Sequence, residues 1–225
     1  MNAISFVNVV KRYGDTEALA GLTLDVRQGE MFGLIGPDGA GKTTAIRLMC
    51  GLLHADAGEL RVLGLDPVKE HRPITERVGY LSQRFSLYGD LTIDENIAFF
   101  AEGHGVRDYQ RRRDQLLSMT QLTPFRKRLA DRLSGGMKQK LALACTLVHE
   151  PTLILLDEPT TGVDPISRRE FWKLLSDFLA HGITILMSTP YLDEAERCSR
   201  VALVHQGRVL ALDEPANLRT LITGR

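Results

Sequence analysis

Short apolar runs alternate with longer, helix-like stretches along most of the chain. Residues 4–13 and 22–26 alternate apolar and polar side chains around a Gly-Asp turn, which predicts short antiparallel strands. Six further apolar runs predict buried strands at residues 31–36, 60–63, 78–82, 152–157, 183–189 and 200–205. Helix-like segments separate several of these runs, at residues 42–53, 167–179 and 191–198. Strands that alternate with helices indicate an α/β fold, with a mostly parallel sheet that helices cover on both faces.

The strand-like pattern is interrupted between residues 92 and 149, where Ile93, Ile97 and Phe100 recur at helical spacing. This interruption indicates a helical insertion into the sheet core. We therefore predict a single domain over residues 1–225. Its sheet core and N-terminal antiparallel β subdomain occupy about 1–83 and 150–225, and its inserted α-helical subdomain occupies about 84–149.

The composition is that of an ordinary globular protein and excludes several classes of protein. The 225 residues include 28 Lys+Arg and 28 Asp+Glu, so the formal net charge is zero and gives no electrostatic reason to expect nucleic-acid binding. No apolar run approaches the roughly 20 residues needed to span a bilayer, and the opening residues lack the features of a signal peptide. The three cysteines are far apart and lack metal-site spacing, which is typical of a reducing compartment. We expect a cytoplasmic protein.

A glycine-rich segment between a predicted strand and a predicted helix is typical of a phosphate-binding loop. Residues 36–43 read GPDGAGKT, which matches the pattern G-x-x-x-x-G-K-[ST]. The candidate phosphate contacts are Gly36, Pro37, Asp38, Gly39, Ala40, Gly41, Lys42, Thr43 and Thr44. Glycines let backbone N–H groups point at phosphate oxygens, while Lys42 can reach the β- and γ-phosphates and the Thr43 hydroxyl can bind Mg²⁺. A glycine turn that merely starts a helix is the alternative, and the strand, lysine, threonine and helix in order favour a nucleoside triphosphate site.

Two acidic residues close a strongly apolar predicted strand. Residues 153–158 read LILLDE, so Asp157 and Glu158 lie at the end of a buried run. A carboxylate there is costly unless it meets a cation, and Mg²⁺ beside the phosphate loop supplies one. We assign Asp157 to the Mg²⁺ side of the site. Glu158 is the candidate catalytic base, able to orient an attacking water or accept its proton. A solvated turn is the alternative for this acidic pair.

A second glycine turn starts another predicted helix. Residues 133–137 read LSGGM, and Ser134 is a natural N-cap for the helix that follows. A capping turn alone would account for this segment. The alternative is that Ser134, Gly135 and Gly136 form an anion site that has no lysine or metal ligand of its own. Such a site has a clear use if it closes over the nucleotide of another copy.

These motifs, in this order, resemble the ATP-binding-cassette (ABC) ATPases, the motor subunits of ABC transporters, over nearly the whole chain. LSGGM is similar to the family signature LSGGQ, with Met137 in place of the glutamine. The resemblance implies a P-loop NTPase fold and hydrolysis of ATP with Mg²⁺. It also implies two cassettes that hold two ATP molecules between the phosphate loop of one and the signature of the other. These cassettes would drive a separate integral membrane permease subunit from the inner face of the cell membrane.

The resemblance gives roles to three residues that carry little signal by themselves. Tyr13 is similar to the aromatic residue that stacks on adenine, although a strand-end tyrosine fits the sequence nearly as well. Gln83 closes a predicted strand and is similar to the glutamine that senses Mg²⁺ and the γ-phosphate. Asp164 is similar to the aspartate that communicates between the two sites, although it also fits an Asp-Pro turn that opens the next helix.

Within the family, RFSLYGDLTIDEN and STPYLDEAERC are most similar to multidrug-type exporters whose ATPase and membrane parts are separate chains. Some relatives carry two cassettes in tandem, so the second cassette is either another copy or another half. We expect a cytoplasmic helix of the permease to dock near Gln83 and residues 85–90. An ABC ATPase that acts on DNA or ribosomes is the first alternative, which the zero net charge disfavours. A metabolite phosphotransferase is the second, which the LSGGM helix and the acidic pair disfavour.

One position departs from the family pattern at a place with chemical consequences. The family usually has a switch histidine after the strand at 183–189, where it hydrogen-bonds the γ-phosphate, and this chain has Pro190. Because proline has neither a side-chain donor nor an N–H, we expect a site that binds ATP well and hydrolyses it slowly. We expect Thr189 to cap the next helix, with Pro190 in its first turn. Asp38 replaces the usual asparagine of the phosphate loop, and we expect its carboxylate to point away from the phosphates.

Overall fold

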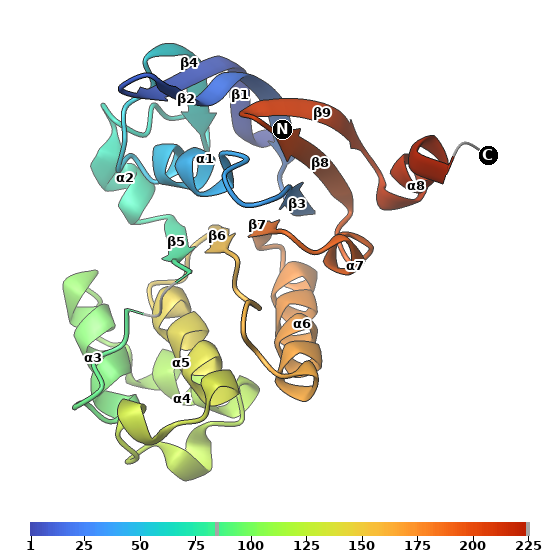
Figure 1. Ribbon diagram of the computed structural model, residues 1–225. Helices are drawn as coiled ribbons and strands as arrows, with labels where there is room; N and C mark the ends of the chain where they lie inside the picture. Colours follow the sequence, from blue (N-terminus) through green and yellow to red (C-terminus); the bar gives the residue numbers. More distant parts are fainter. Residues whose placement is uncertain (84–85, 224–225) are drawn as a thin grey trace.

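Two β-sheets and eight α-helices make up the described part of the chain in the computed structural model (Figure 1), which describes residues 1–83 and 86–223 and omits the side chains of 220–223. The strands are β1 (Asn2–Tyr13), β2 (Thr16–Arg27), β3 (Met31–Ile35), β4 (Ala57–Val62), β5 (Val78–Leu81), β6 (Leu153–Asp157), β7 (Thr184–Thr189), β8 (Arg200–His205) and β9 (Arg208–Asp213). The α-helices are α1 (Lys42–Met49), α2 (His71–Thr75), α3 (Ile93–Gly103), α4 (Gln110–Met119), α5 (Gly135–Leu147), α6 (Pro165–Ala180), α7 (Leu192–Ala195) and α8 (Pro215–Thr223). Two short 3-10 turns, Thr123–Phe125 and Ala130–Arg132, join α4 to α5.

The larger sheet has the strand order β5-β6-β7-β3-β8-β9, in which the first five strands are parallel and β9 is antiparallel to β8. Every residue of β3 and β6 is buried, because apolar layers cover both faces of the sheet. Alternate residues of β6 belong to different layers. Leu155 packs with the antiparallel sheet and α1, and Leu156 packs with α5 and α6. The mostly parallel α/β sheet predicted from the apolar runs is confirmed.

The smaller sheet has the order β2-β1-β4 and is antiparallel throughout. The alternation of apolar and polar residues puts Phe6 and Leu22 in the core while their neighbours face outward. Tyr13 pairs with Thr16 across the Gly-Asp turn. The predicted strand at 60–63 is β4 and belongs to this sheet, so the expected N-terminal antiparallel unit has three strands.

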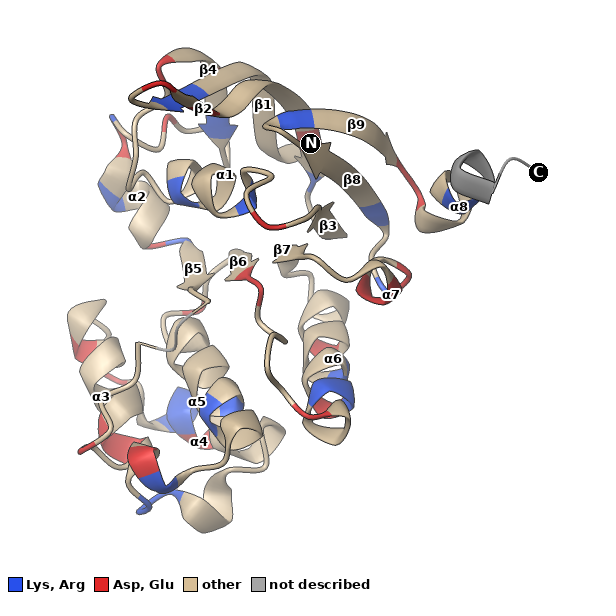
Figure 2. Ribbon diagram, in the orientation of Figure 1, with Lys and Arg blue, Asp and Glu red and all other residues tan. Residues whose placement is uncertain are grey.

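Helices α3, α4 and α5 lie together on the side of the larger sheet away from β1, β2 and β4 (Figure 1). The first of them begins with a capping box, in which the side chains of Thr92 and Glu95 each accept the other's backbone N–H. Its buried residues Ile93 and Ile97 share an apolar cluster with Leu141 of α5. Acidic and basic residues are interspersed over these helices and over both sheets (Figure 2).

Three elements, α2, β9 and α8, were not predicted, and the helices predicted at 42–53 and 191–198 are too long. Strand β9 lies at the edge of the sheet and has no fully buried residue, so its apolar pattern is weak, and α8 follows it. The helix expected at 191–198 is only the four-residue α7, because Ser199 already donates its N–H to the carbonyl of Met31 and leads into β8. None of the helices in the described ranges has the length and hydrophobicity needed to cross a bilayer.

Candidate nucleotide-binding site

The glycine-rich loop runs from the end of β3 to the start of α1, as predicted, and its close contacts explain two of the glycines. A Cβ atom on Gly36 would lie 2.2 Å from the carbonyl oxygen of Val204. Gly41 has φ 102°, and a Cβ atom there would lie 2.5 Å from the carbonyl oxygen of Ala18. Neither position admits a side chain without moving backbone, so the loop keeps its shape only with glycine at both places.

Lys42 lies buried inside this loop. Its ammonium group donates hydrogen bonds to the carbonyl oxygens of Gly36, at 2.8 Å, and Pro37, at 3.0 Å. It also pairs with the carboxylate of Glu158, at 3.2 Å. An ammonium group has three donors, and these three contacts use all of them. The lysine is therefore held where the loop's backbone curves around it.

Asp157 is a buried carboxylate at the end of β6. Its side chain is 1% exposed and accepts hydrogen bonds from the hydroxyls of Thr43, at 3.1 Å, and Ser188, at 2.7 Å. Among the residues that the structure describes, no Lys, Arg or His lies within ion-pair distance of it. Burial raises the pKa of Tyr80 to about 12, and the negative charge of Asp157 contributes to that rise.

A carboxylate beside a hydroxyl is a donor set that fits Mg²⁺. Asp157 and Thr43 supply only two ligand groups between them, and no group of three or more His, Cys, Asp and Glu in the described ranges could hold a metal ion. A Mg²⁺ ion here would take its other ligands from phosphate oxygens and water, as this ion usually does. The arrangement fits the metal assignment made from the sequence.

Glu158 turns out of the strand direction directly after β6. Its φ of 48° lies in the left-handed region, which is uncommon for a residue other than glycine and is found at functional sites. Its N–H donates to the hydroxyl oxygen of Ser188 at 3.0 Å, and its carboxylate accepts from the Gln83 amide at 2.9 Å. The kink thus brings Glu158, Gln83 and Lys42 together.

One cavity of about 620 Å³ connects most of the predicted residues. It is lined by Tyr13, Thr16, Glu17, Ala18, residues 38–44, Gln83, Glu158, Thr161, Pro190 and Tyr191. Asp38 is exposed and borders this cavity. The predicted residues Gly36, Pro37 and Asp157 are not among the residues that line it.

Sequence analysis missed several residues of this lining. Thr16 was within reach, because the Gly-Asp turn makes it the partner of Tyr13 in the β1–β2 hairpin. No motif marks Glu17, Thr161 or Tyr191, and they reach the cavity only through the folding of the chain.

The second glycine turn and Asp164 lie together, but outside this cavity. Ser134 caps α5 by accepting the N–H of Met137 at 3.3 Å, and Asp164 caps α6 by accepting two backbone N–H groups. A Cβ atom on Gly136 would lie 2.1 Å from the hydroxyl of Ser167 in α6 and 3.8 Å from the carboxylate of Asp164. Ser134, Gly135 and Asp164 are exposed, so both turns present polar groups to a surface that this chain's phosphate loop does not reach.

Pro190 borders the cavity, but the helix start predicted around it is wrong. Strand β7 stays paired with β3 through Thr189, and α7 begins only at Leu192, after Tyr191. The Thr189 hydroxyl accepts the N–H of Tyr191 at 3.1 Å and donates to Glu194 at 2.7 Å. Thr189 is therefore not the cap of the next helix, and Pro190 does not lie in its first turn.

Comparison with known proteins places these features in a family. The family described as ABC transporter matches residues 19–161, which is more than half of the chain. A probable multidrug ABC transporter ATP-binding protein of Escherichia coli, YbhF, is 48% identical over 94% of this chain, and this chain spans only 37% of its length. The Nod factor export ATP-binding protein I of Burkholderia orbicola is 41% identical over 94% of this chain and 71% of its own length. The daunorubicin resistance ATP-binding protein DrrA3 of Streptomyces coeruleorubidus is 41% identical over 93% of this chain and 67% of its own length.

Solved structures give the same result. CbiO1 from Clostridium perfringens, part of the ABC transporter complex cbiONQ, superposes with a TM-score of 0.88 at 26% identity and covers 97% of this chain and 91% of its own. An ATP-binding subunit of an ABC transporter superposes with a TM-score of 0.87 at 30% identity and covers 98% of this chain and 93% of its own. With the phosphate loop, the acidic strand end and the second glycine turn in place, the chain belongs to the ABC transporter family as one of its ATP-binding domains.

Proposed function

We propose that this domain binds ATP with Mg²⁺, hydrolyses it, and uses the cycle to drive export through a separate membrane subunit. The relatives named for multidrug transport, Nod factor export and daunorubicin resistance support the direction of transport. The observation that carries the proposal is the cluster of Lys42, Glu158 and Gln83, which line one cavity beside the Thr43–Asp157 pair.

ATP fits this cavity in one direction. Tyr13, exposed at the hairpin end, would stack on adenine, and the backbone N–H groups of residues 38–44 would hold the phosphates. Thr43, Asp157 and Gln83 would hold Mg²⁺, which supplies neutralisation of the phosphate charge when it is bound. Gly36 and Pro37 complete the loop behind Lys42.

Binding of ATP would also release the catalytic base. Lys42 now divides its three donors between two carbonyl oxygens and Glu158. Phosphate oxygens would draw the ammonium group toward the nucleotide, since they carry more charge than a carbonyl. Glu158, still held by Gln83, would then be free to orient a water molecule and accept its proton.

The second glycine turn would act on another domain. Ser134, Gly135 and Asp164 are exposed, and neither they nor the buried Gly136 line the cavity of their own domain. They would close over the ATP of a second cassette, either another copy of this chain or a tandem or separate partner. ATP would then hold two domains together, and hydrolysis would let them part.

The membrane subunit would dock where apolar side chains are exposed at the edge between the sheet core and the helices. Tyr88 and Phe99 are exposed, and their ring centroids are 4.4 Å apart. Leu52, also exposed, borders a nearby cavity of about 220 Å³ with Phe100. We propose a cytoplasmic helix of the permease as the occupant, which would hold the domain on the inner face of the cell membrane. Phe85, at the start of the segment predicted to dock, lies outside the described residues.

The test is Glu158→Gln with MgATP. If Glu158 is the base, the variant should bind ATP without hydrolysing it and should form a dimer by size-exclusion chromatography. Glu150→Gln is a matched control, because Glu150 also has a positive φ but is exposed and does not line the cavity. A Glu158→Gln protein that hydrolyses ATP at the wild-type rate, or that binds ATP and stays monomeric, would refute the proposal.

A further inference from the structure

A buried carboxylate next to the site has no role in the function described so far. Glu194 lies in the short helix α7 and is 1% exposed. One of its oxygens accepts a hydrogen bond from the hydroxyl of Thr160 at 2.5 Å, and the other accepts from the hydroxyl of Thr189 at 2.7 Å. A buried carboxylate with a donor on each oxygen is held firmly, because breaking either bond leaves charge without a partner.

The two threonines come from two different segments that border the nucleotide cavity. Thr160 comes two residues after Glu158, in a turn closed by the hydrogen bond from the Thr161 N–H to the Glu158 carbonyl, at 3.3 Å. Thr189 is the last residue of β7, directly before Pro190. Both Glu158 and Pro190 line the cavity. One side chain of α7 therefore fixes the catalytic base relative to the end of β7.

A positive charge on the neighbouring helix strengthens this connection. The guanidinium of Arg168 in α6 has its Nε atom 3.9 Å from Glu194. The same guanidinium lies 5.3 Å from the ring centroid of Tyr191, which lines the cavity. Arg168 thus balances the buried charge of Glu194 and links it to a third part of the cavity wall.

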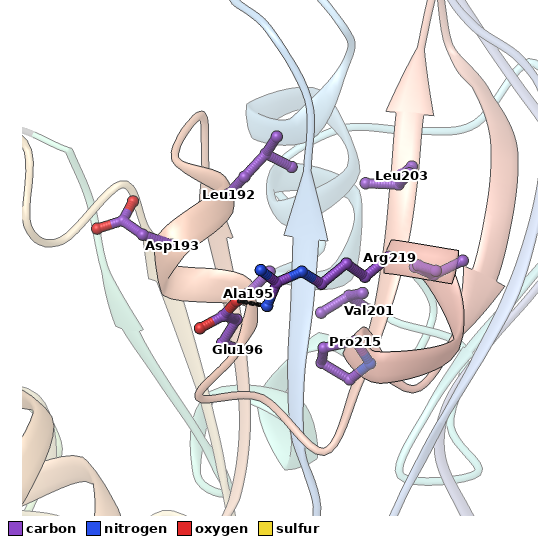
Figure 3. A pocket seen from close by; sticks show the side chains of 9 residues that line it. Leu192, Asp193, Ala195, Glu196, Val201, Leu203, Pro215 and Arg219 are labelled. Carbon is purple, nitrogen blue, oxygen red and sulfur yellow. Dashed lines mark hydrogen bonds and ion pairs between the residues drawn. The ribbon is translucent and has the colours of Figure 1, made fainter. Parts of the chain in front are cut away.

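The other side of α7 gives it less support. There, Leu192, Ala195 and Glu196 border a separate cavity of about 370 Å³ with Pro215 and Arg219 (Figure 3). A helix of four residues makes few contacts, and this one faces a hollow on one side. Acidic residues are prominent on α7 (red in Figure 2). Through its bonds to Thr160 and Thr189, Glu194 provides the main polar anchor of this helix to the site.

We propose that Glu194 is a positioning residue for ATP hydrolysis, which holds Glu158 and the end of β7 in register through the hydroxyls of Thr160 and Thr189. The inference rests on the proposed ATPase function. It has particular weight in this chain because Pro190 offers no side-chain donor that could order the same end of the cavity by contact with the nucleotide.

The test removes one donor at a time while keeping the shape of the side chain. Thr160→Val and Thr189→Val should each lower kcat at saturating MgATP about tenfold, the loss expected for one hydrogen bond to a charged group. The KM for ATP should change less than about twofold, since the phosphate loop is untouched. Thr160→Ser and Thr189→Ser restore the hydroxyl and should restore kcat. Thr120→Val is the matched control, because it removes another buried hydroxyl that bonds only within its own helix.

Two further measurements separate positioning from folding. Trp172, the only tryptophan in the sequence, is buried in α6 with the Arg197 guanidinium 5.4 Å from its ring, so its emission reports packing near α7. If Glu194 has a positioning role, the valine variants should keep the wild-type tryptophan emission. Like Glu158→Gln, they should accumulate as an ATP-bound dimer. Valine variants with wild-type kcat overturn the proposal, as does a loss of kcat that comes with altered emission or weaker ATP binding. A wild-type protein without any ATP hydrolysis overturns the proposed function itself.

Discussion

Replacing Pro190 by histidine should accelerate ATP hydrolysis. Pro190 lines the cavity with Gln83 and Glu158, and it has no group that can donate to a phosphate oxygen. The neighbouring hydroxyls are already used, because Ser188 donates to Asp157 and Thr189 donates to Glu194. An imidazole at position 190 would therefore add a donor that the end of β7 now lacks.

The expected gain follows from one new hydrogen bond. A hydrogen bond to a charged group is worth about 1.5–3 kcal/mol, and a contact that strengthens in the transition state raises kcat rather than affinity alone. At about 1.4 kcal/mol for each factor of ten, kcat should rise about 10–100-fold. Loss of the proline should also lower the free energy of unfolding by about 0.4–1 kcal/mol, because the unfolded chain becomes more flexible.

The assay is steady-state phosphate release by Pro190→His and Pro190→Ala beside the wild type. Pro190→Ala frees the backbone in the same way but adds no donor, so it should stay near the wild-type rate. If both variants hydrolyse ATP within twofold of the wild type while binding it normally, the missing donor does not limit the rate. If Pro190→Ala is as fast as Pro190→His, the backbone and not the imidazole is responsible.

Three other substitutions test the site and its surroundings. Lys42→Met leaves Glu158 buried without its cation, so urea unfolding of the nucleotide-free protein should show a loss of about 3–5 kcal/mol. Gly136→Ala forces a Cβ atom to 2.1 Å from a serine hydroxyl of α6 and should cost about 1–3 kcal/mol in the same assay, whereas Gly135→Ala, with nothing within 4 Å, should not destabilise the protein. Burial lowers the pKa of His149 from 6.5 to about 4, and repulsion from the positive charge of His104 contributes to this shift. As the pH falls, His149 therefore binds a proton in the unfolded chain before it does so in the folded protein. The free energy of unfolding should decrease as the pH drops from about 6.5 to 4. His149→Gln should make this decrease smaller, which urea unfolding midpoints measured between pH 7 and 5 would show.

The sheet core was predictable because local signals and the final environment agree. The run at 153–157 is apolar at every position until Asp157, and β6 is buried on both faces. The phosphate loop was predictable for a similar reason, since Gly36 and Gly41 each lie against a backbone carbonyl that leaves no room for a side chain. In both cases a local sequence pattern and a packing requirement select the same residues.

Contacts between segments that lie far apart in the chain could not be predicted from the sequence. Thr189 and Pro190 read as a helix start, because threonine and proline are frequent there, yet pairing with β3 keeps the chain extended through Thr189. The hydroxyl that suggested a cap instead bonds Glu194. Likewise, nothing local marks Glu194, whose partners come from two strand ends that only the parallel sheet brings together.

In the proposed pairing, Ser134 of one domain would make the rate at the other domain's site depend on both domains. If ATP lies between the phosphate loop of one domain and Ser134 of another, a pair holds two sites, and Pro190 affects only the site whose own β7 carries it. In a pair of identical copies both sites should be slow, and Pro190→His should accelerate both. In a pair with a domain that carries histidine there, the partner's site already turns over, and the substitution should raise turnover per pair by no more than about twofold. Measuring turnover per dimer, first with this chain alone and then with its partner, therefore distinguishes the two assemblies.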